Sequence, residues 1–152
     1  MVSEDILQRV RNAFKQSLFE VMEKMYFVFL EPGSEEGLEE GLHAVEVGFS
    51  GPWEGKITVY FSPDLLFFMI NNVLGLEERE IDDKVRIDTA KECTNMVAGS
   101  FLRKFEPEKA IHLSIPEYLG VQHLKKLQGE FTLTMEAERG RMSAAVSFYR
   151  AT

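Results

Sequence analysis

Between positions 88 and 99, three side chains that could do chemistry and one glycine recur at the spacing of a helix. They follow one another at intervals of three or four and are Asp88, Glu92, Asn95 and Gly99. A helix would place them along one side, with Glu92 and Asn95 one turn apart. A carboxylate can pair with a cation, and an amide can both accept and donate hydrogen bonds. We call these four residues the polar stripe.

The composition of the polar stripe is unusual for a face that serves stability alone. Asn and Gly are poor helix formers, and Gly costs about 1 kcal/mol relative to Ala. Asp88 and Glu92 repel each other at a spacing of four, where a lysine would pair with either of them. Gly99 removes side-chain bulk, so another surface could approach the helix closely. The stripe is therefore a candidate contact or catalytic site, and an ordinary exposed helix side is the alternative.

A long helix from about Asp82 to Phe105, closed by Pro107, must carry this stripe. Its opposite side is expected to face the core and consists of Ile87, Ala90, Cys93, Thr94, Val97, Phe101 and Phe105.

Two further helices are predicted. One is capped by Ser3 and stopped before Pro32, and its apolar spacing runs through Ile6, Val10, Phe14, Leu18, Val21 and Met25. The other, from Leu65 to Leu74, begins at Ser62-Pro63-Asp64 and is stopped by Gly75. It is almost wholly apolar, so we expect it to be largely buried. The segment from Pro32 to Gly41 is expected to be an exposed loop.

The remaining segments alternate as strands do. Val45 to Phe49 and Ile57 to Phe61 form a hairpin with a five-residue loop, Gly51 to Gly55. Later strands are expected at Ile111–Ile115, Phe131–Ala137 and Met142–Tyr149. The order α-β-β-α-α-β-β-β predicts an α+β domain, an antiparallel sheet covered by helices. The apolar last strand would leave a sheet edge that must be covered or paired.

Length and charge limit the classes of function. The 152 residues suit a single domain spanning 1–152. With 17 Lys and Arg against 25 Asp and Glu, the net charge is −8, which disfavours nucleic acid and anionic membranes as partners. The longest apolar run, Leu65 to Ile70, is too short to span a bilayer, and the N-terminus does not resemble an export signal. One cysteine fits a reducing compartment, so we expect a cytoplasmic protein.

Most catalytic constellations are missing from the sequence. His43, His112 and His123 lie far apart, and none has a second ligand at metal spacing, so no metal site is expected. Cys93 is expected to be a core thiol and not a nucleophile. The sequence also has no phosphate-binding glycine loop and no G-x-S-x-G elbow.

The long helix resembles the signature helix of the CheC/CheX/FliY phosphatases of bacterial chemotaxis, through Asp88–Gly99 (DTAKECTNMVAG). Phe49–Gly55 is similar to the glycine-flanked first hairpin of that family, and Leu113–Pro116 to its strand-ending proline. The resemblance covers about Val45 to Phe148. Because the chain has a single Glu-x-x-Asn, with no asparagine three residues after Glu20, it resembles the CheX branch more than two-site CheC.

This resemblance implies a phosphatase that removes the phosphoryl group from the aspartate of a CheY-like response regulator and so ends the chemotaxis signal. It implies that Asn95 orients the hydrolytic water and that Glu92 pairs with the active-site lysine of the receiver. We expect Asp88, Gly99 and Arg103 to contact the receiver. No cofactor of the chain's own is implied, since Mg²⁺ belongs to the response regulator. CheX relatives form dimers through a continued sheet, so a homodimer is expected.

Three other functions compete with this one. CheX relatives often have Asn after the glycine and Lys three residues after it, where this chain has Ser100 and Leu102. These departures favour a non-catalytic adaptor that docks on a receiver or a flagellar switch component. A small-molecule enzyme of thioesterase-like form would need a core-facing polar residue that the long helix does not offer. A purely structural domain would leave the polar stripe unexplained.

Overall fold

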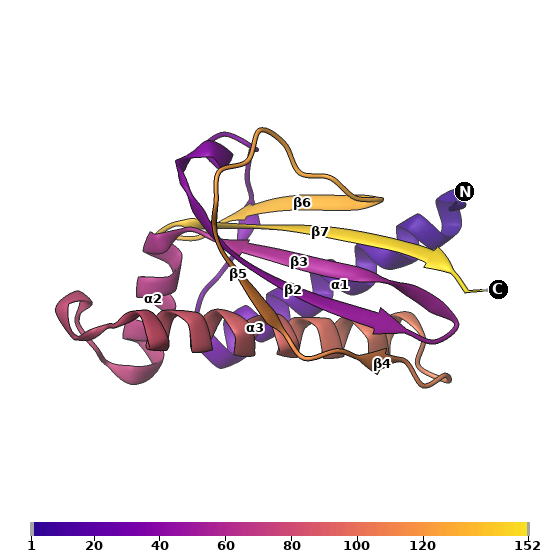
Figure 1. The fold of residues 1–152 in the computed structure, drawn as a ribbon, viewed down its shortest axis with the longest axis horizontal. Coiled ribbons are helices and arrows are strands. Elements are labelled where there is room, and N and C mark those ends of the chain that lie inside the picture. The colour runs from indigo at the N-terminus through magenta and orange to yellow at the C-terminus, as the bar shows by residue number, and fades with distance from the viewer. Residues whose placement is uncertain (1, 152) are drawn as a thin grey trace.

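An antiparallel sheet forms one layer of the molecule, and the long helices pack against one of its faces (Figure 1). The computed structural model describes residues 2–151. Its helices in that range are α1 (Glu4–Tyr26), α2 (Pro63–Leu74) and α3 (Asp83–Phe105), with short 3-10 turns at Leu38–Glu40 and Glu78–Glu80. Its strands are β1 (Glu31–Pro32), β2 (Leu42–Ser50), β3 (Trp53–Phe61), β4 (His112–Leu113), β5 (Glu117–Gln122), β6 (Phe131–Glu136) and β7 (Arg141–Arg150). The predicted α+β class is confirmed.

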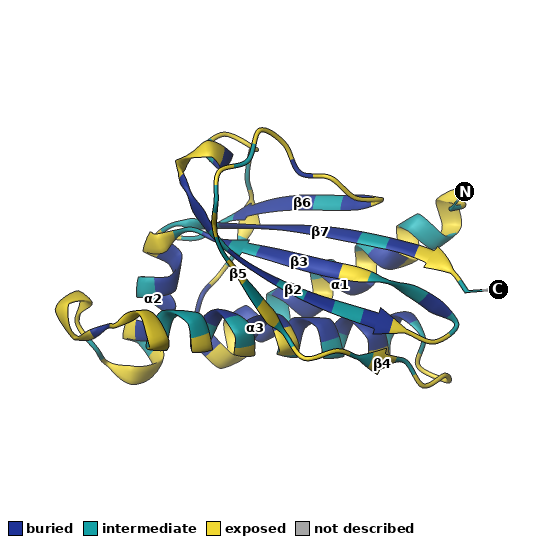
Figure 2. Ribbon diagram, in the orientation of Figure 1, coloured by how far each residue is buried: buried dark blue, intermediate teal, exposed yellow. Residues whose placement is uncertain are grey.

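The strand order is β1-β6-β7-β3-β2-β4, and β5 also pairs with β2. The expectation that the last strand forms a sheet edge is wrong. β7 lies between β3 and β6, with Ala144 opposite both Val59 and Leu133. Its apolar residues are therefore needed inside the sheet, as the dark centre of Figure 2 shows.

The first hairpin has a shorter loop than predicted. Gly51 and Pro52 alone connect β2 to β3, because Trp53 to Gly55 already pair with β7. Trp53 is buried in the core. The strand expected at Ile111–Ile115 is reduced to β4, since Ile115 projects into solvent. The chain then forms β5, which was not predicted because its residues are alternately exposed and half-buried.

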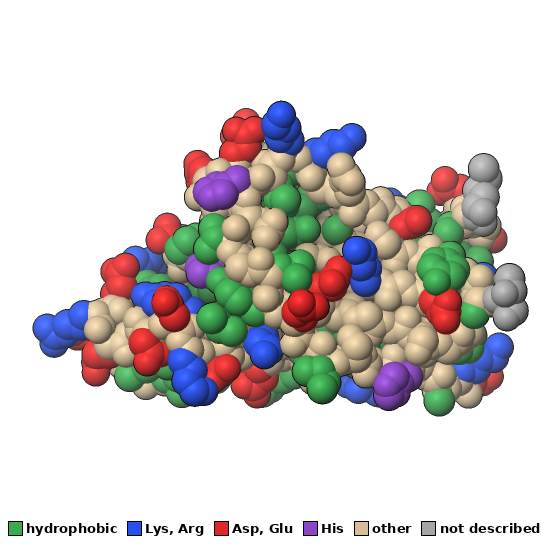
Figure 3. All heavy atoms as spheres, in the orientation of Figure 1, with side chains coloured by type: hydrophobic (Ala, Val, Ile, Leu, Met, Phe, Trp, Pro, Cys, Tyr) green, Lys and Arg blue, Asp and Glu red, His purple; other side chains and the backbone are tan. Residues whose placement is uncertain are grey.

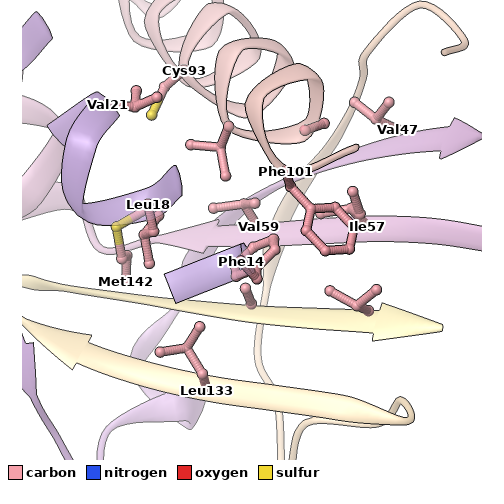
Figure 4. Close-up of a cluster of buried hydrophobic side chains, with 14 of the residues drawn as sticks. Phe14, Leu18, Val21, Val47, Ile57, Val59, Cys93, Phe101, Leu133 and Met142 are labelled. Atoms are coloured by element: carbon pink, nitrogen blue, oxygen red, sulfur yellow. The ribbon is translucent and has the colours of Figure 1, made fainter. Parts of the chain in front are cut away.

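The core lies between the sheet and α1 and α3. Phe14 of α1 contacts Phe101 of α3 edge-on at 5.5 Å between ring centroids, and side chains from both helices meet Ile57 and Val59 of β3 (Figure 4). α1 and α3 run antiparallel, because Arg9 donates to the carbonyl of Phe105 at 2.7 Å while Met22 lies against Cys93.

The opposite face of the sheet has a smaller apolar cluster. Leu38, Leu42 and Leu127 are buried there, with Tyr60 and Leu124 packed against them. Most of the segment from Pro32 to Gly41 is exposed, as expected of a loop, but Leu38 anchors it to the sheet and Pro32 belongs to β1. Figure 3 shows this face, on which charges of both signs are interspersed. No helix in residues 2–151 has the length and apolarity needed to cross a membrane.

Candidate functional site

α3 positions the polar stripe, and its sequence determines where the helix begins and which face it buries. Asp82 caps the helix, with its Oδ1 accepting a hydrogen bond from the Val85 N–H at 2.9 Å. The buried residues of α3 are Ala90, Cys93, Thr94, Val97, Ala98, Phe101, Leu102 and Phe105. The predicted core face is confirmed except at Ile87, which is half-buried. The buried face is wider than predicted because α3 packs against both α1 and the sheet.

The predicted site residues lie together on the exposed side of α3. Asp88, Glu92 and Asn95 are exposed and Gly99 is half-buried, while Arg103 is exposed one turn further on. Within residues 2–151, no hydrogen bond or ion pair engages the side chain of Glu92 or Asn95. The carboxylate and the amide are therefore both available to a partner.

Asp88 differs from the other stripe residues because it is already paired. Its Oδ2 accepts a hydrogen bond from the Lys84 ammonium at 2.8 Å, and this bond raises the pKa of Lys84. The expectation that Asp88 meets only a like charge is thus wrong, since Lys84 lies one turn before it. The pair is exposed, so it adds little to stability. It leaves Glu92 as the uncompensated carboxylate beside Asn95.

A groove of about 460 Å³ runs beside the stripe, between α1 and α3. Asn95, Gly99 and Arg103 line it from α3, and Glu20, Lys24 and Met25 line it from α1. The α1 residues were not predicted as part of the site. No signal in the local sequence marks them, because only the antiparallel packing of the two helices brings them near Asn95.

Neither departure from the family pattern is a residue of the polar stripe, although Ser100 lines the same groove as Asn95 and Gly99. Ser100 Oγ hydrogen-bonds Ser17 Oγ at 2.9 Å and accepts from Lys104 Nζ at 3.0 Å, while Leu102 is buried. Lys104 also donates to Glu20 at 3.0 Å, and this hydrogen bond holds the pKa of the Glu20 carboxyl below its usual range. Ser100 and Lys104 thus join α3 to α1, and neither contacts the side chain of Glu92 or Asn95 through a hydrogen bond.

Gly99 and Arg103 act as neighbours on the helix surface. A Cβ at Gly99 would lie 3.3 Å from Arg103 Nη1 and 3.8 Å from Leu113 Cδ1. The guanidinium of Arg103 therefore lies over Gly99 and forms one end of the groove. The space left by the absent side chain of Gly99 is occupied by the guanidinium of Arg103, which places a positive charge next to the stripe.

The other candidate nucleophiles and ligands lie elsewhere. Cys93 is fully buried, with its Sγ 3.7 Å from Met22 Sδ, and burial raises the pKa of its thiol. It is inert as a nucleophile in this environment. Histidine side chains lie apart on the face in Figure 3, and residues 2–151 contain no cluster of three metal-ligating side chains.

Solved structures with the same fold include bacterial chemotaxis proteins. Chemotaxis protein CheX from Vibrio vulnificus is 21% identical with a TM-score of 0.78, over 92% of this chain and 96% of that one. A CheC-like protein from Shewanella is 24% identical with a TM-score of 0.73, over 93% and 97%. CheX in the CheX-CheY-BeF3-Mg²⁺ complex from Borrelia burgdorferi is 17% identical with a TM-score of 0.72, over 92% and 97%.

No curated protein sequence matches the chain. The family model for chemotaxis phosphatase CheX matches residues 44–130, which is more than half of the 152 residues and includes α3 with its entire polar stripe. The resemblance that the sequence suggested is confirmed: the chain belongs to the CheX family of chemotaxis phosphatases.

Proposed function

We propose that this chain hydrolyses the aspartyl phosphate of a CheY-like response regulator and thereby ends a chemotaxis signal. The observation that carries the proposal is the exposed pair Glu92 and Asn95, one turn apart and free of other partners within residues 2–151, on α3 of a CheX-family domain. The Borrelia burgdorferi complex, which contains CheX, CheY, BeF3 and Mg²⁺, supports the choice of partner.

Asn95 is the residue that we assign to the chemical step. Hydrolysis of a phosphoryl group depends mainly on alignment of the attacking water and on stabilisation of charge. The carbonyl oxygen of an amide accepts a hydrogen bond from that water, and its NH₂ group donates nearby. A carboxylate in the same place would repel the phosphoryl oxygens. Asn95 therefore holds the water in line with phosphorus, while the Mg²⁺ and lysine of the receiver neutralise the charge.

Glu92 and the residues around it hold the receiver in place. The uncompensated carboxylate of Glu92 pairs with the active-site lysine of the receiver, one helical turn from Asn95. Asp88, Gly99 and Arg103 contact the receiver, and the absence of a side chain at Gly99 leaves room for the Arg103 guanidinium. The chain itself contributes no metal or cofactor in this scheme. Residues 1–152 act as one phosphatase domain in the cytoplasm, assembled as a homodimer.

The test is loss of phosphate from a purified, phosphorylated CheY-like receiver with Mg²⁺ present. The wild-type chain should accelerate it. Asn95→Ala should lower the rate by about 10²–10³, as removal of one positioned group commonly does, with an unchanged circular dichroism spectrum. An Asn95→Ala protein with wild-type turnover would contradict the assignment.

The same experiment separates the phosphatase from the adaptor alternative. Glu92→Ala should weaken binding of the receiver, because it removes the partner of the receiver's lysine. If the wild-type chain binds the receiver without accelerating phosphate loss, the chain is an adaptor that docks on receivers or switch components.

A further inference from the structure

The residue that ends α1, Phe27, is aromatic and has a strained backbone conformation. Phe27 has a φ of 57° in the left-handed region, which bulky residues rarely adopt, and it is the only non-glycine residue in 2–151 with a positive φ. Its side chain is 62% exposed, and that of Phe29 is 72% exposed. Tyr26 and Val28 are both buried, so the two phenylalanines project away from the core. Neither ring is part of the hydrophobic core, so neither stabilises the fold by packing there.

This exposed segment is held firmly. The N–H groups of Phe27 and Val28 both donate to the carbonyl of Met22, the latter at 2.9 Å. The side-chain amide of Asn72, near the end of α2, donates to the carbonyls of Tyr26 at 3.1 Å and Phe27 at 3.4 Å. The rings are thus presented by a fixed backbone. A segment whose backbone is already ordered loses less entropy on binding than a mobile segment does.

The segment adjoins the site on α3. Because α1 and α3 are antiparallel, the end of α1 lies beside Glu92 and Asn95: Met25, which is also exposed, lines the same groove as Asn95. Burial raises the pKa of Tyr26, and Cys93 and then the charge of Glu92 add to the shift, as expected of neighbours. From Met25 to Phe29 the chain can span at most about 14 Å.

We propose that Met25, Phe27 and Phe29, the aromatic end patch, form a docking surface for an apolar surface of the phosphorylated receiver. The inference rests on the proposed function and adds the residues that supply affinity. A standard interface covers about 800 Å² per partner, a disc of roughly 16 Å radius. A receiver centred on Asn95 would cover Met25, and the two rings follow two and four residues further along the chain. The polar stripe offers only small or charged groups, whereas buried aromatic anchors supply most of the binding energy in typical interfaces.

The receiver is the occupant that fits this position. The patch shares Met25 with the groove that contains Asn95, so a second copy seated on Met25 would obstruct the groove. The exposed apolar residues of β5, Leu119 and Val121, belong to the opposite edge of the sheet order from β1 and offer a separate surface for self-association.

The test compares Phe27→Gly and Phe29→Ser with Tyr149→Ser, which removes an aromatic ring of 60% exposure at the far end of β7. Steady-state dephosphorylation of the receiver should show KM raised about tenfold for Phe27→Gly, since loss of an anchor commonly costs about one power of ten. The kcat should change far less, and Tyr149→Ser should keep the wild-type KM. Glycine also relieves the strained φ, so the Tm of Phe27→Gly should equal or exceed that of wild type.

The outcomes separate this inference from the proposed function. An active wild type and a Phe27→Gly variant with unchanged KM would overturn the patch and leave the phosphatase standing. If the wild type binds the receiver without turnover, a larger Kd for Phe27→Gly than for wild type still supports docking of the receiver on the patch. If the wild type neither binds nor hydrolyses, both proposals fail. A Phe27→Gly variant that changes only the sedimentation coefficient would assign the patch to a second copy and overturn the inference.

Discussion

At the residue scale, Gly99 is the position at which we expect the demands of stability and of docking to oppose each other. Alanine in its place would gain up to about 1 kcal/mol of helix propensity. The nearest atom to the new Cβ is Arg103 Nη1 at 3.3 Å, the end of a flexible side chain that can move. The fold therefore has no strict need of glycine here, and we expect the need to arise from what approaches the helix.

Gly99→Ala should raise the free energy of unfolding by up to about 1 kcal/mol and also raise KM for the receiver, because it displaces Arg103 and thickens the stripe. Urea denaturation and steady-state kinetics measure the two effects. A variant that is stabilised and has an unchanged KM would remove Gly99 from the docking surface.

Residue spacing alone was sufficient to predict which side of α3 would be exposed. Asp88, Glu92 and Asn95 are exposed as predicted, because their positions follow from the 3.6-residue period of the helix. The groove residues of α1, such as Lys24 and Met25, could not be predicted in this way. They join Asn95 through tertiary packing of segments some 70 residues apart, which no local pattern encodes.

At the scale of elements, helix ends were predictable and strand positions were less so. Ser3 and Ser62 cap their helices as predicted, since a side-chain oxygen at the N-cap bonds a nearby N–H whatever the tertiary context. Asp82, predicted only as the approximate start of the long helix, is its N-cap. The place of β7 in the sheet depends instead on which strands it pairs with. Its run of small and apolar residues suits a strand that is paired on both sides, but it does not say which strands are its partners.

Ser62 connects α2 to the rest of the fold through two hydrogen bonds of its hydroxyl group. Its Oγ accepts from the N–H of Leu65 at 3.2 Å and from the N–H of Arg141 at 3.0 Å, so it both caps α2 and joins it to β7. Ser62→Ala should lower the free energy of unfolding by about 1–2 kcal/mol, as loss of a helix cap with a second hydrogen bond does. Denaturation by urea measures the loss, and Ser3→Ala, which removes one cap bond at an exposed helix start, is the control. Equal losses of the free energy of unfolding in the two variants would contradict a stabilising contribution from the Ser62–Arg141 hydrogen bond.

At the scale of the whole molecule, the open edge of β5 is where we expect two copies to meet. Leu119 and Val121 are exposed along this strand, and pairing two such edges would continue the sheet across a dimer. Val121→Lys should therefore shift sedimentation from dimer to monomer, while Thr132→Lys, on the other half of the sheet, should not. A wild-type chain that sediments as a monomer at micromolar concentration would refute the dimer.

The pH dependence of stability should reflect His43. Its Nδ1 lies 2.8 Å from the hydroxyl of Tyr118, and burial, with Arg86 adding to it and Asp83 opposing it, lowers the pKa of the imidazole. The unfolded chain, with a histidine pKa of about 6.5, then takes up a proton before the folded one does. The contribution of His43 to stability is complete above about pH 6.5 and is lost as the pH falls toward the lowered folded-state pKa.

Urea denaturation at pH 7.5 and pH 5.0 should accordingly show a smaller loss of stability on acidification for His43→Gln than for wild type. His112→Gln, at an exposed position, is the control for removal of one imidazole. The same loss in wild type and His43→Gln would show that the acid sensitivity arises elsewhere.

The central claim is that a neutral amide at position 95 aligns water for attack on phosphorus, and Asn95→Asp tests it most directly. Aspartate keeps the size of the side chain and replaces the NH₂ donor with a negative charge. The measurement is single-turnover loss of phosphate from a prephosphorylated CheY-like receiver with Mg²⁺ and saturating wild-type or variant chain. We predict a fall in rate of at least about 10²-fold for Asn95→Asp, with an unchanged fold. A wild-type rate from Asn95→Asp would contradict the account.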